Sequence, residues 1–146
     1  MSNQNYLNEN KFELDRLISL VARLDDAALA KRVGKSWTVG ALFGHLAFWD
    51  DMAARRLRQW KETGNPPPSV MSIYHLINDS MLELLNCCDL RFLADLAVRN
   101  ARATDSLVEN LDAEFISTVE NSDQARLLQR HAHRKMHLDK IEEALV

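Results

Sequence analysis

The chain has 146 residues, of which 47% are hydrophobic, and its formal net charge is −3. This length and composition are typical of one globular domain, which we predict over residues 1–146, and they exclude an intrinsically disordered protein. The acidic balance disfavours binding to nucleic acid or to an anionic membrane. Two adjacent cysteines, Cys87 and Cys88, do not make a disulfide framework, and we interpret them as small hydrophobic residues.

The compartment expected from the sequence is the cytoplasm. Residues 1–6 contain no charged region that leads into an apolar stretch, so no signal peptide is recognised. The longest apolar run, residues 41–49, is interrupted by Gly44 and His45 and is too short to cross a bilayer.

The first part of the chain is expected to form one long helix and one short one. Over residues 6–24, apolar side chains recur at intervals of three and four, which is the spacing of one helix face. Asp25 and Asp26 then open a short helical turn that ends near Gly34.

A second long helix is predicted from Thr38, whose side chain is suited to an N-cap, to about Glu62. It ends at residues 63–65, which are followed by three prolines at residues 66–68. Because proline lacks a backbone N–H and clashes with the preceding helical turn, this run is a strong helix breaker.

Three further helices complete the predicted fold. A shorter one is expected over residues 72–86, and Asp89 caps a long one over residues 90–111. The last begins after Ser122 and runs nearly to the end of the chain. No stretch has the alternating, β-branched pattern of strands, and there is no hairpin signal. The sequence therefore predicts an all-α bundle of four long helices and a shorter connecting one, in which the second and third long helices are free to run parallel.

The strongest chemical signal is a pair of histidines, His133 and His137, in the predicted last helix. A helix turns about 100° per residue, so this spacing leaves the two imidazoles roughly 40° apart and one turn removed, and both can bind one divalent metal. His45 lies on an apolar stripe of the second long helix and supplies a third ring. We predict a buried three-histidine metal site. The alternative, which stays open, is that each histidine is a hydrogen-bonded core or boundary residue.

Three nitrogen donors leave part of a metal's coordination sphere open. Structural zinc usually has four protein ligands, whereas three ligands plus water is the catalytic arrangement. No cysteine lies at a spacing that would close the site. The open position is therefore expected to take water or a substrate oxygen or sulfur. Zinc is the first choice, with nickel or iron behind it.

Two arginines, Arg130 and Arg134, flank the predicted site on the inward face of the last helix. One interpretation is a clamp for a carboxylate-bearing substrate, and the other is a pair of structural ion pairs with acids of a neighbouring helix. His131 is expected to be a boundary or surface residue. His75 has no partner at ligand spacing and is interpreted as structural.

Four short motifs follow one another along nearly the whole chain. They are residues 37–39 (Trp-Thr-Val), 44–50 (Gly-His-Leu-Ala-Phe-Trp-Asp), 77–79 (Ile-Asn-Asp) and 133–141 (His-Arg-Lys-Met-His-Leu-Asp-Lys-Ile). In this order they resemble the DinB-like superfamily. The resemblance implies a four-helix bundle with long crossover connections, a divalent metal held by His45, His133 and His137, and a homodimer. We add Trp49 to Arg130 and Arg134 as a candidate for substrate contact.

The resemblance implies a class of activity and no single reaction. Some relatives are thiol-dependent enzymes, including bacillithiol transferases and mycothiol-dependent maleylpyruvate isomerase, and others resemble hydrolases that open strained electrophilic rings. We therefore expect a metal-dependent enzyme that acts on a small electrophile by thiol transfer or hydrolysis, with a low-molecular-weight thiol as a candidate cofactor. No catalytic residue is assigned. The alternative is a non-enzymatic stress or interaction protein in which the histidines are structural. Nothing in the sequence supports DNA binding.

Overall fold

The computed structural model describes residues 5–146, and these residues are almost entirely helical. The helices are α1 (Asn5–Arg23), α2 (Asp26–Leu29), α3 (Val39–Thr63), α4 (Tyr74–Asn86), α5 (Leu90–Glu109), α6 (Ala113–Glu120) and α7 (His131–Leu145), with a 3-10 turn η1 (Ala125–Leu127) before α7. The prediction of an all-α protein is therefore confirmed.

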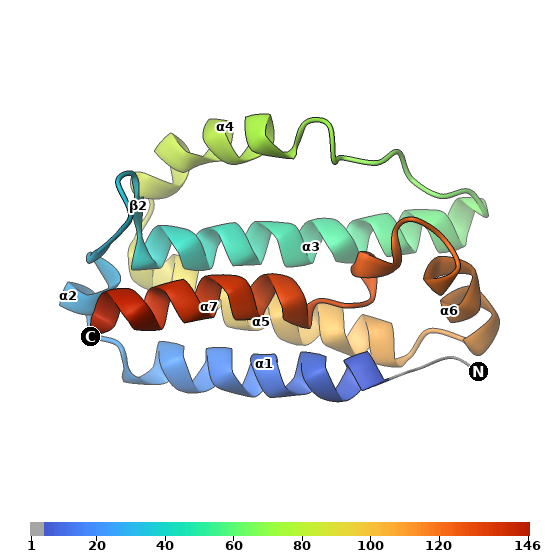
Figure 1. Ribbon diagram of the computed structural model, residues 1–146, viewed down its shortest axis with the longest axis horizontal. Helices are drawn as coiled ribbons and strands as arrows, with labels where there is room; N and C mark the ends of the chain where they lie inside the picture. Colours follow the sequence, from blue (N-terminus) through green and yellow to red (C-terminus); the bar gives the residue numbers. More distant parts are fainter. Residues whose placement is uncertain (1–4) are drawn as a thin grey trace.

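The long helices α1, α3, α5 and α7 lie side by side (Figure 1). α3 packs against α5 and α7, and α1 packs against the same two helices. α3 and α5 run in the same direction because the connection that contains α4 carries the chain back along the molecule (Figure 1). α4 lies outside the four long helices and packs mainly against α3.

The core consists of two apolar clusters with buried polar residues between them. One cluster contains fully buried residues such as Leu17, Phe43, Ala97 and Ile141. The other contains residues such as Tyr6, Leu57, Val108 and Leu128. Along each long helix, a buried polar residue separates the parts of the chain that serve the two clusters: Asn10 on α1, Asp50 on α3, Asp105 on α5 and Arg134 on α7. Ionic groups therefore lie in the middle of the core.

The helix ends follow the local signals in the sequence. The Thr38 side chain accepts a hydrogen bond from the Ala41 N–H at 3.0 Å and caps α3, as predicted. Gly64 ends α3 in the left-handed region with φ 74°, where a side chain would be strained. The Asp89 carboxylate accepts from the Phe92 N–H at 3.0 Å and caps α5, which is also as predicted.

The absence of strands was predicted wrongly for one short segment. Strands β1 (Arg32–Val33) and β2 (Trp37–Thr38) form a small antiparallel hairpin between α2 and α3. Gly34 opens its turn with φ 68°, which only glycine adopts without strain. Two-residue strands are too short to show an alternating pattern, so no strand could be predicted here from the residue pattern.

The start of the last helix was also predicted wrongly, since α7 begins at His131 and not after Ser122. The residues between Ser122 and His131 contain only the turn η1. Before Ser122 lies α6, a helix that the sequence did not predict, which Asp112 caps by accepting from the Phe115 N–H at 2.8 Å. The Ser122 hydroxyl donates to the Val119 carbonyl at 2.6 Å and accepts from the Gln124 N–H at 3.0 Å. Ser122 therefore closes α6 and shapes the following turn.

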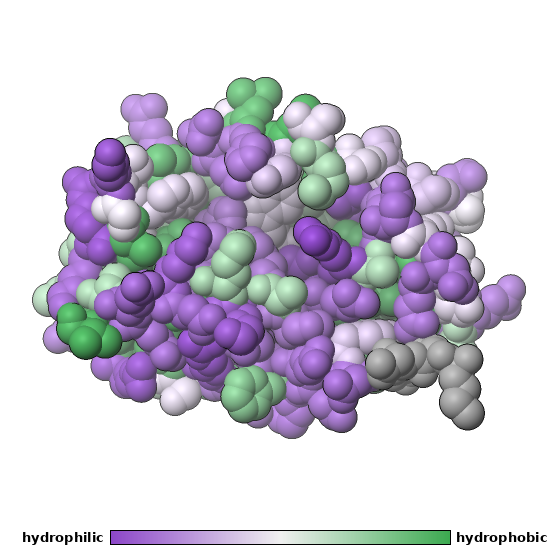
Figure 2. All heavy atoms as spheres, in the orientation of Figure 1, coloured by the Kyte–Doolittle hydropathy of each residue, from purple (hydrophilic) through white to green (hydrophobic). Residues whose placement is uncertain are grey.

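The surface that carries α7 is predominantly hydrophilic, with isolated apolar side chains (Figure 2). Among residues 5–146, no helix has both the length and the apolar character that a bilayer span requires. The prediction about a signal peptide rests largely on residues 1–4, which lie outside the described part of the chain.

Candidate metal centre

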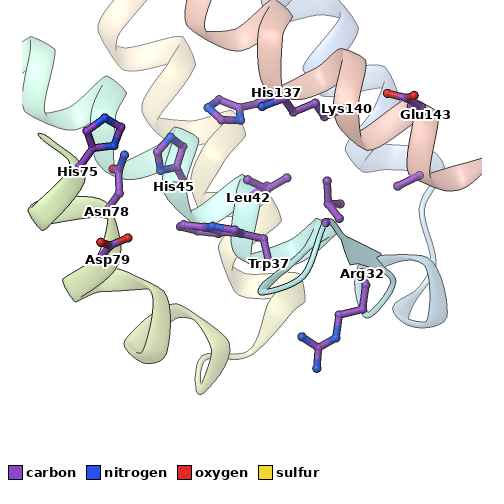
Figure 3. A pocket seen from close by; sticks show the side chains of 13 residues that line it. Arg32, Trp37, Leu42, His45, His75, Asn78, Asp79, His137, Lys140 and Glu143 are labelled. Atoms are coloured by element: carbon purple, nitrogen blue, oxygen red, sulfur yellow. The ribbon is translucent and has the colours of Figure 1, made fainter.

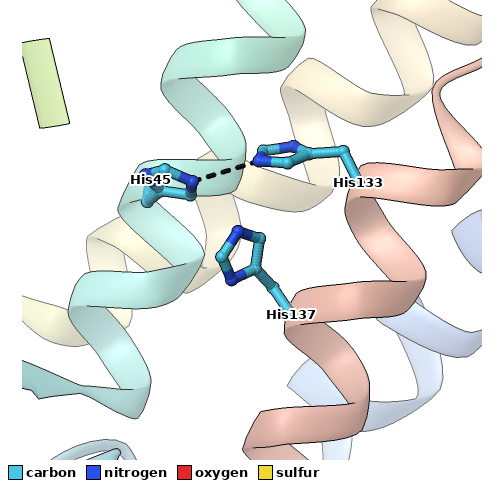
Figure 4. A group of neighbouring side chains, drawn as sticks. All are labelled: His45, His133 and His137. Carbon is cyan, nitrogen blue, oxygen red and sulfur yellow. Dashed lines mark hydrogen bonds between the residues drawn. The ribbon is translucent and has the colours of Figure 1, made fainter. Parts of the chain in front are cut away.

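Three histidines from two helices converge at one point, which we call the histidine triad (His45, His133 and His137). His45 lies on α3, and His133 and His137 lie one turn apart on α7. Their rings point toward one another across the contact between the two helices (Figure 4). The spacing of four residues on α7 therefore places both rings on the side that faces α3, as the sequence predicted.

The distances within the triad fit a shared metal ion. His45 Nε2 lies 3.1 Å from His133 Nε2, and one nitrogen from each ring falls within 4.8 Å of the other two. Zinc–imidazole bonds of about 2.0–2.1 Å place two nitrogens of a tetrahedral site roughly 3.3 Å apart. Ring centroids are separated by 4.6 to 5.0 Å. Small rotations of the side chains are enough to bring the three donors to metal-binding separations.

The triad lies in a poorly solvated environment that keeps its rings neutral. Burial, followed by the neighbouring His137 and Lys140, lowers the pKa of His45 to about 3. Burial and Lys140 lower the pKa of His137 to about 4. Burial is also the main reason why the pKa of His133 is well below its usual value. Neutral imidazole is the form that binds metals, so the rings are in the ligand state near pH 7.

Hydrogen bonding within the described residues does not satisfy the triad. The Nδ1 atoms of His45, His133 and His137 are buried, and none has a hydrogen-bond partner within residues 5–146. Most buried polar side-chain atoms in proteins are paired, and an unpaired one costs about 1–3 kcal/mol. Three neighbouring rings that each carry one such atom are unusual for a purely structural cluster. A metal held at the facing nitrogens, which are Nε2 for His45 and His133, would leave the Nδ1 atoms of these two rings to other partners, so the metal site is inferred from the converging donors.

A second buried polar cluster lies directly beside the triad, and we call it the ion-pair layer (Asp50, Asp105, Arg130 and Arg134). The Asp50 carboxylate accepts from Arg130 Nε at 2.9 Å and from Arg134 Nε at 3.2 Å. Arg134 also donates to both oxygens of Asp105, at 2.7 and 2.9 Å. The layer joins α3, α5 and α7.

The ion-pair layer shows where the two candidate substrate-binding arginines lie. Arg134 has no exposed surface and Arg130 is 7% exposed. Their contacts are those of the structural alternative considered for the sequence, in which each arginine pairs with an acid of a neighbouring helix. Contact of either arginine with a substrate stays a prediction, and the proposed function below does not depend on it.

A pocket of about 670 Å³ opens onto the triad. His45 and His137 form part of its wall (Figure 3). The apolar part of the wall includes Trp37 and Leu42, and Trp37 packs edge-on against the His45 ring with centroids 5.4 Å apart. The triad therefore has access to space in which a small molecule fits.

The wall opposite α7 comes from α4, which contributes His75, Asn78 and Asp79 (Figure 3). α4 approaches α3 closely at Gly44, where an added Cβ would lie 2.8 Å from Leu85 Cδ2. Glycine at this position, immediately before His45, lets the wall pack beside the triad. His75, which was interpreted as structural from the sequence, lies in the pocket wall, and its role stays a prediction.

Other predicted residues lie outside the pocket wall. The Trp49 indole N–H donates to Asn78 Oδ1 at 2.9 Å, so it links α3 to α4. Its contact with a substrate stays a prediction. His131 lies at the boundary and pairs with Glu9 at 2.8 Å, in agreement with the sequence.

Trp37 and Asp79 belonged to the quoted motifs but were not singled out as site residues, because sequence spacing does not show which segments share a pocket.

Comparison with known proteins identifies the family. The sequence profile of the DinB superfamily matches residues 10–141, which is most of the chain. Neither the curated proteins nor the solved structures that were compared contain a match. The matched segment includes the whole histidine triad and the ion-pair layer. The chain belongs to the DinB superfamily.

Proposed function

We propose that this protein is a divalent-metal-dependent enzyme that acts on a small electrophilic substrate by thiol transfer or hydrolysis. One observation carries the proposal: one ring nitrogen from each of three neutral imidazoles, one buried and two half-buried, lies within 4.8 Å of the other two, and two of the rings line a pocket. His45, His133 and His137 would hold the ion. When bound, such an ion acts as a Lewis acid that lowers the pKa of a bound thiol or water.

The protein's own residues prepare this chemistry in two ways. Burial keeps the three rings unprotonated, so that they are free to bind a cation. Trp37 and Leu42 form an apolar wall next to His45, which excludes water from one side of the pocket. Excluding water strengthens electrostatic interactions inside a site.

Several finer assignments extend the proposal. The whole chain, residues 1–146, would form one DinB-like four-helix bundle with long crossovers, and the metal would be zinc, with nickel or iron as the next choices. A low-molecular-weight thiol would serve as cofactor in the transfer reaction. A homodimer, a role in stress and a cytoplasmic location follow from the family resemblance and the sequence. The molar mass of the purified protein in solution tests the dimer.

One observation favours a second candidate, a non-enzymatic protein with a structural histidine patch. The contact of 3.1 Å between His45 Nε2 and His133 Nε2 is a hydrogen bond that needs no metal. This candidate accounts for one contact and leaves the convergence of the third ring, His137, on that pair unexplained. It predicts that a chelator leaves the folded structure unchanged and that the protein converts no substrate.

The first experiment is elemental analysis of protein purified without a histidine-rich tag and without added metal. About one equivalent of metal is expected per chain, and the variants H45A, H133A and H137A should each lose it. H131A is the matched control on α7 and should keep its metal, because His131 pairs with Glu9 outside the triad. Full metal occupancy in all three triad variants would refute the metal centre.

The second experiment tests the activity. The metal-loaded protein is incubated with low-molecular-weight thiols and model electrophiles, and adducts and hydrolysis products are detected by mass spectrometry. Products that depend on the metal and on His133 support the enzyme. A protein that binds metal and forms no product with any thiol or with water favours the structural role.

A further inference from the structure

The pocket beside the triad contains a lysine, Lys140, close to two of the metal-ligand candidates. Lys140 lies three residues after His137 on α7 and lines the same pocket as His45 and His137. In Figure 3 its side chain extends from α7 toward the ring of His137. Its positive charge acts on both rings, since it contributes to the lowered pKa of His45 and of His137.

Lys140 forms no ion pair within the part of the chain that the structure describes. Its neighbours on α7 are paired: Lys135 binds Asp139 at 2.7 Å, and Arg134 binds Asp50 and Asp105. Glu143 lines the same pocket three residues later, and no ion pair joins it to Lys140 within residues 5–146. The ammonium group is therefore available to a ligand.

A lysine in this position is unfavourable for metal binding alone. Lys140 is exposed, so water weakens the repulsion between its charge and a metal ion, and the repulsion that remains lowers the affinity of the triad for the metal. A negative charge placed between the two would be attracted to both. The electrostatic energy of Lys140 and a bound metal is therefore most favourable when the pocket holds an anion between them.

The rest of the pocket narrows the class of anion. Trp37 and Leu42 offer an apolar surface on which a hydrocarbon or aromatic body can pack. Two cations, Arg32 and Lys140, are balanced in the lining by two acids, Asp79 and Glu143. The guanidinium of Arg32 points away from the histidine rings (Figure 3), so Lys140 is the cation beside them. One cation favours a monoanion over a doubly charged phosphate.

We propose that the pocket binds small carboxylic acids with an apolar body, and that Lys140 receives the carboxylate beside the metal centre. This inference rests on the proposed function, because it assumes that the triad holds a metal. It adds a substrate class, and it assigns specificity to a residue outside the triad and outside the ion-pair layer.

The test measures binding to the zinc-loaded, tag-free protein by isothermal titration calorimetry. The probes are phenylacetate and its neutral analogue phenylacetamide. A charge-assisted hydrogen bond to Lys140 should make phenylacetate bind at least about tenfold more tightly than the amide. K140Q should lower this ratio at least about threefold, to the preference that the zinc ion alone gives, and K140R should restore it because the charge remains. K135Q is the matched control, since Lys135 is an exposed lysine of α7 outside the pocket wall.

The outcomes separate the inference from the proposed function. Zinc should bind K140Q at least as tightly as the wild type, because a repelling cation has been removed. If zinc binds but phenylacetate and phenylacetamide bind equally well, or if the ratio of their affinities is the same in K140Q as in the wild type, the inference is wrong and the metal centre stands. If the wild type does not bind zinc, the proposed function fails and the inference fails with it.

Discussion

The buried ion-pair layer, on α3, α5 and α7, and the partly buried histidine triad, on α3 and α7, are neighbouring polar clusters that differ in how many of their polar atoms have hydrogen-bond partners. In the layer, both oxygens of Asp50 and both oxygens of Asp105 accept hydrogen bonds from arginine. In the triad, three buried nitrogens have no partner within residues 5–146. A cluster whose polar atoms are all paired holds helices in register, whereas one with unpaired atoms has capacity to bind a water, an ion or another ligand.

The layer also explains how the triad is held in place. Asp50 lies five residues after His45 on α3, and Arg134 is the neighbour of His133 on α7. Burial opposes a charge on Arg134, but Asp50 and Asp105 outweigh it and raise the pKa of this arginine. The resulting ion pairs fix α7 against α3 within two turns of the three rings. We infer that the ion-pair layer fixes the position of α7 relative to α3, and that this position brings the three histidine rings together.

Breaking the layer should have the largest effect on stability. The substitution D50N removes the charge that pairs with Arg130 and Arg134 and leaves both guanidinium groups without it in the core. Removing one partner of a buried ion pair typically lowers the free energy of unfolding by about 3–5 kcal/mol. Urea-induced unfolding measures the change.

The matched control for D50N is D15N, because Asp15 pairs with Lys11 on the exposed side of α1 at 3.3 Å. Exposed pairs of this kind contribute roughly 0–1 kcal/mol. A loss for D50N as small as that for D15N would mean that the layer does not stabilise the bundle.

Binding of zinc to the triad should have the next largest effect on the free energy of unfolding. A ligand that binds only the folded state stabilises it by about 2.7 kcal/mol at a hundredfold excess over its dissociation constant. Zinc at such an excess should therefore raise the free energy of unfolding of the wild type by roughly 3 kcal/mol, and H133A should abolish the increase. Measuring the unfolding midpoint with and without zinc gives the difference. H75A should respond like the wild type, since His75 lies in the wall and not in the triad; a lost response there would place the metal elsewhere.

Features that depend on contacts between residues close in the sequence were predicted, whereas those that depend on contacts between distant segments were not. The caps at Thr38 and Asp89 and the stop at Gly64 were predicted because they depend on contacts within a few residues. The convergence of His133 and His137 followed from helical spacing. The partners of Arg134 were not predicted, because choosing Asp50 and Asp105 requires the packing of three helices.

The pocket and the last loop show the same limit. α4 forms a wall only because it folds back over α3, which local patterns do not reveal. The predicted start of the last helix after Ser122 failed because serine suits both a helix cap and a turn, and the turn after α6 uses its hydroxyl. Both features depend on where distant segments meet.

The stability of the metal-free protein should depend on pH through the triad, with a smaller effect than the substitution D50N and the zinc binding above. In the unfolded chain a histidine takes up a proton near pH 6.5, whereas the pKa of folded His45 is lowered to about 3 by burial and its neighbours. Between these values the unfolded state binds more protons, so the stability falls as the pH is lowered and is fully present above about pH 6.5. His45 alone contributes a slope of roughly 1 kcal/mol per pH unit within this window.

Chemical unfolding at pH 7, 6 and 5 in the presence of a chelator measures this slope. The variant H45Q lacks the titrating group and should show a shallower dependence than the wild type. Excess zinc should shift the loss of stability to lower pH, because a bound metal competes with protons for the same nitrogens. Identical slopes for H45Q and the wild type would mean that the ring is protonated as easily in the folded state as in the unfolded one.

The smallest effect is expected at α4, which belongs to neither cluster but completes the pocket. W49F removes the hydrogen bond from the indole to Asn78, which typically contributes about 0.5–1.5 kcal/mol, while keeping an aromatic ring. Because α4 packs mainly on α3, the loss should appear as faster amide hydrogen exchange in α4, with little change in the four long helices. N78A should have the same effect, since it removes the other half of the bond. If exchange in α4 is unchanged in both variants, the close packing of Leu85 at Gly44 holds the wall, and the pocket is as rigid as the ion-pair layer beside it.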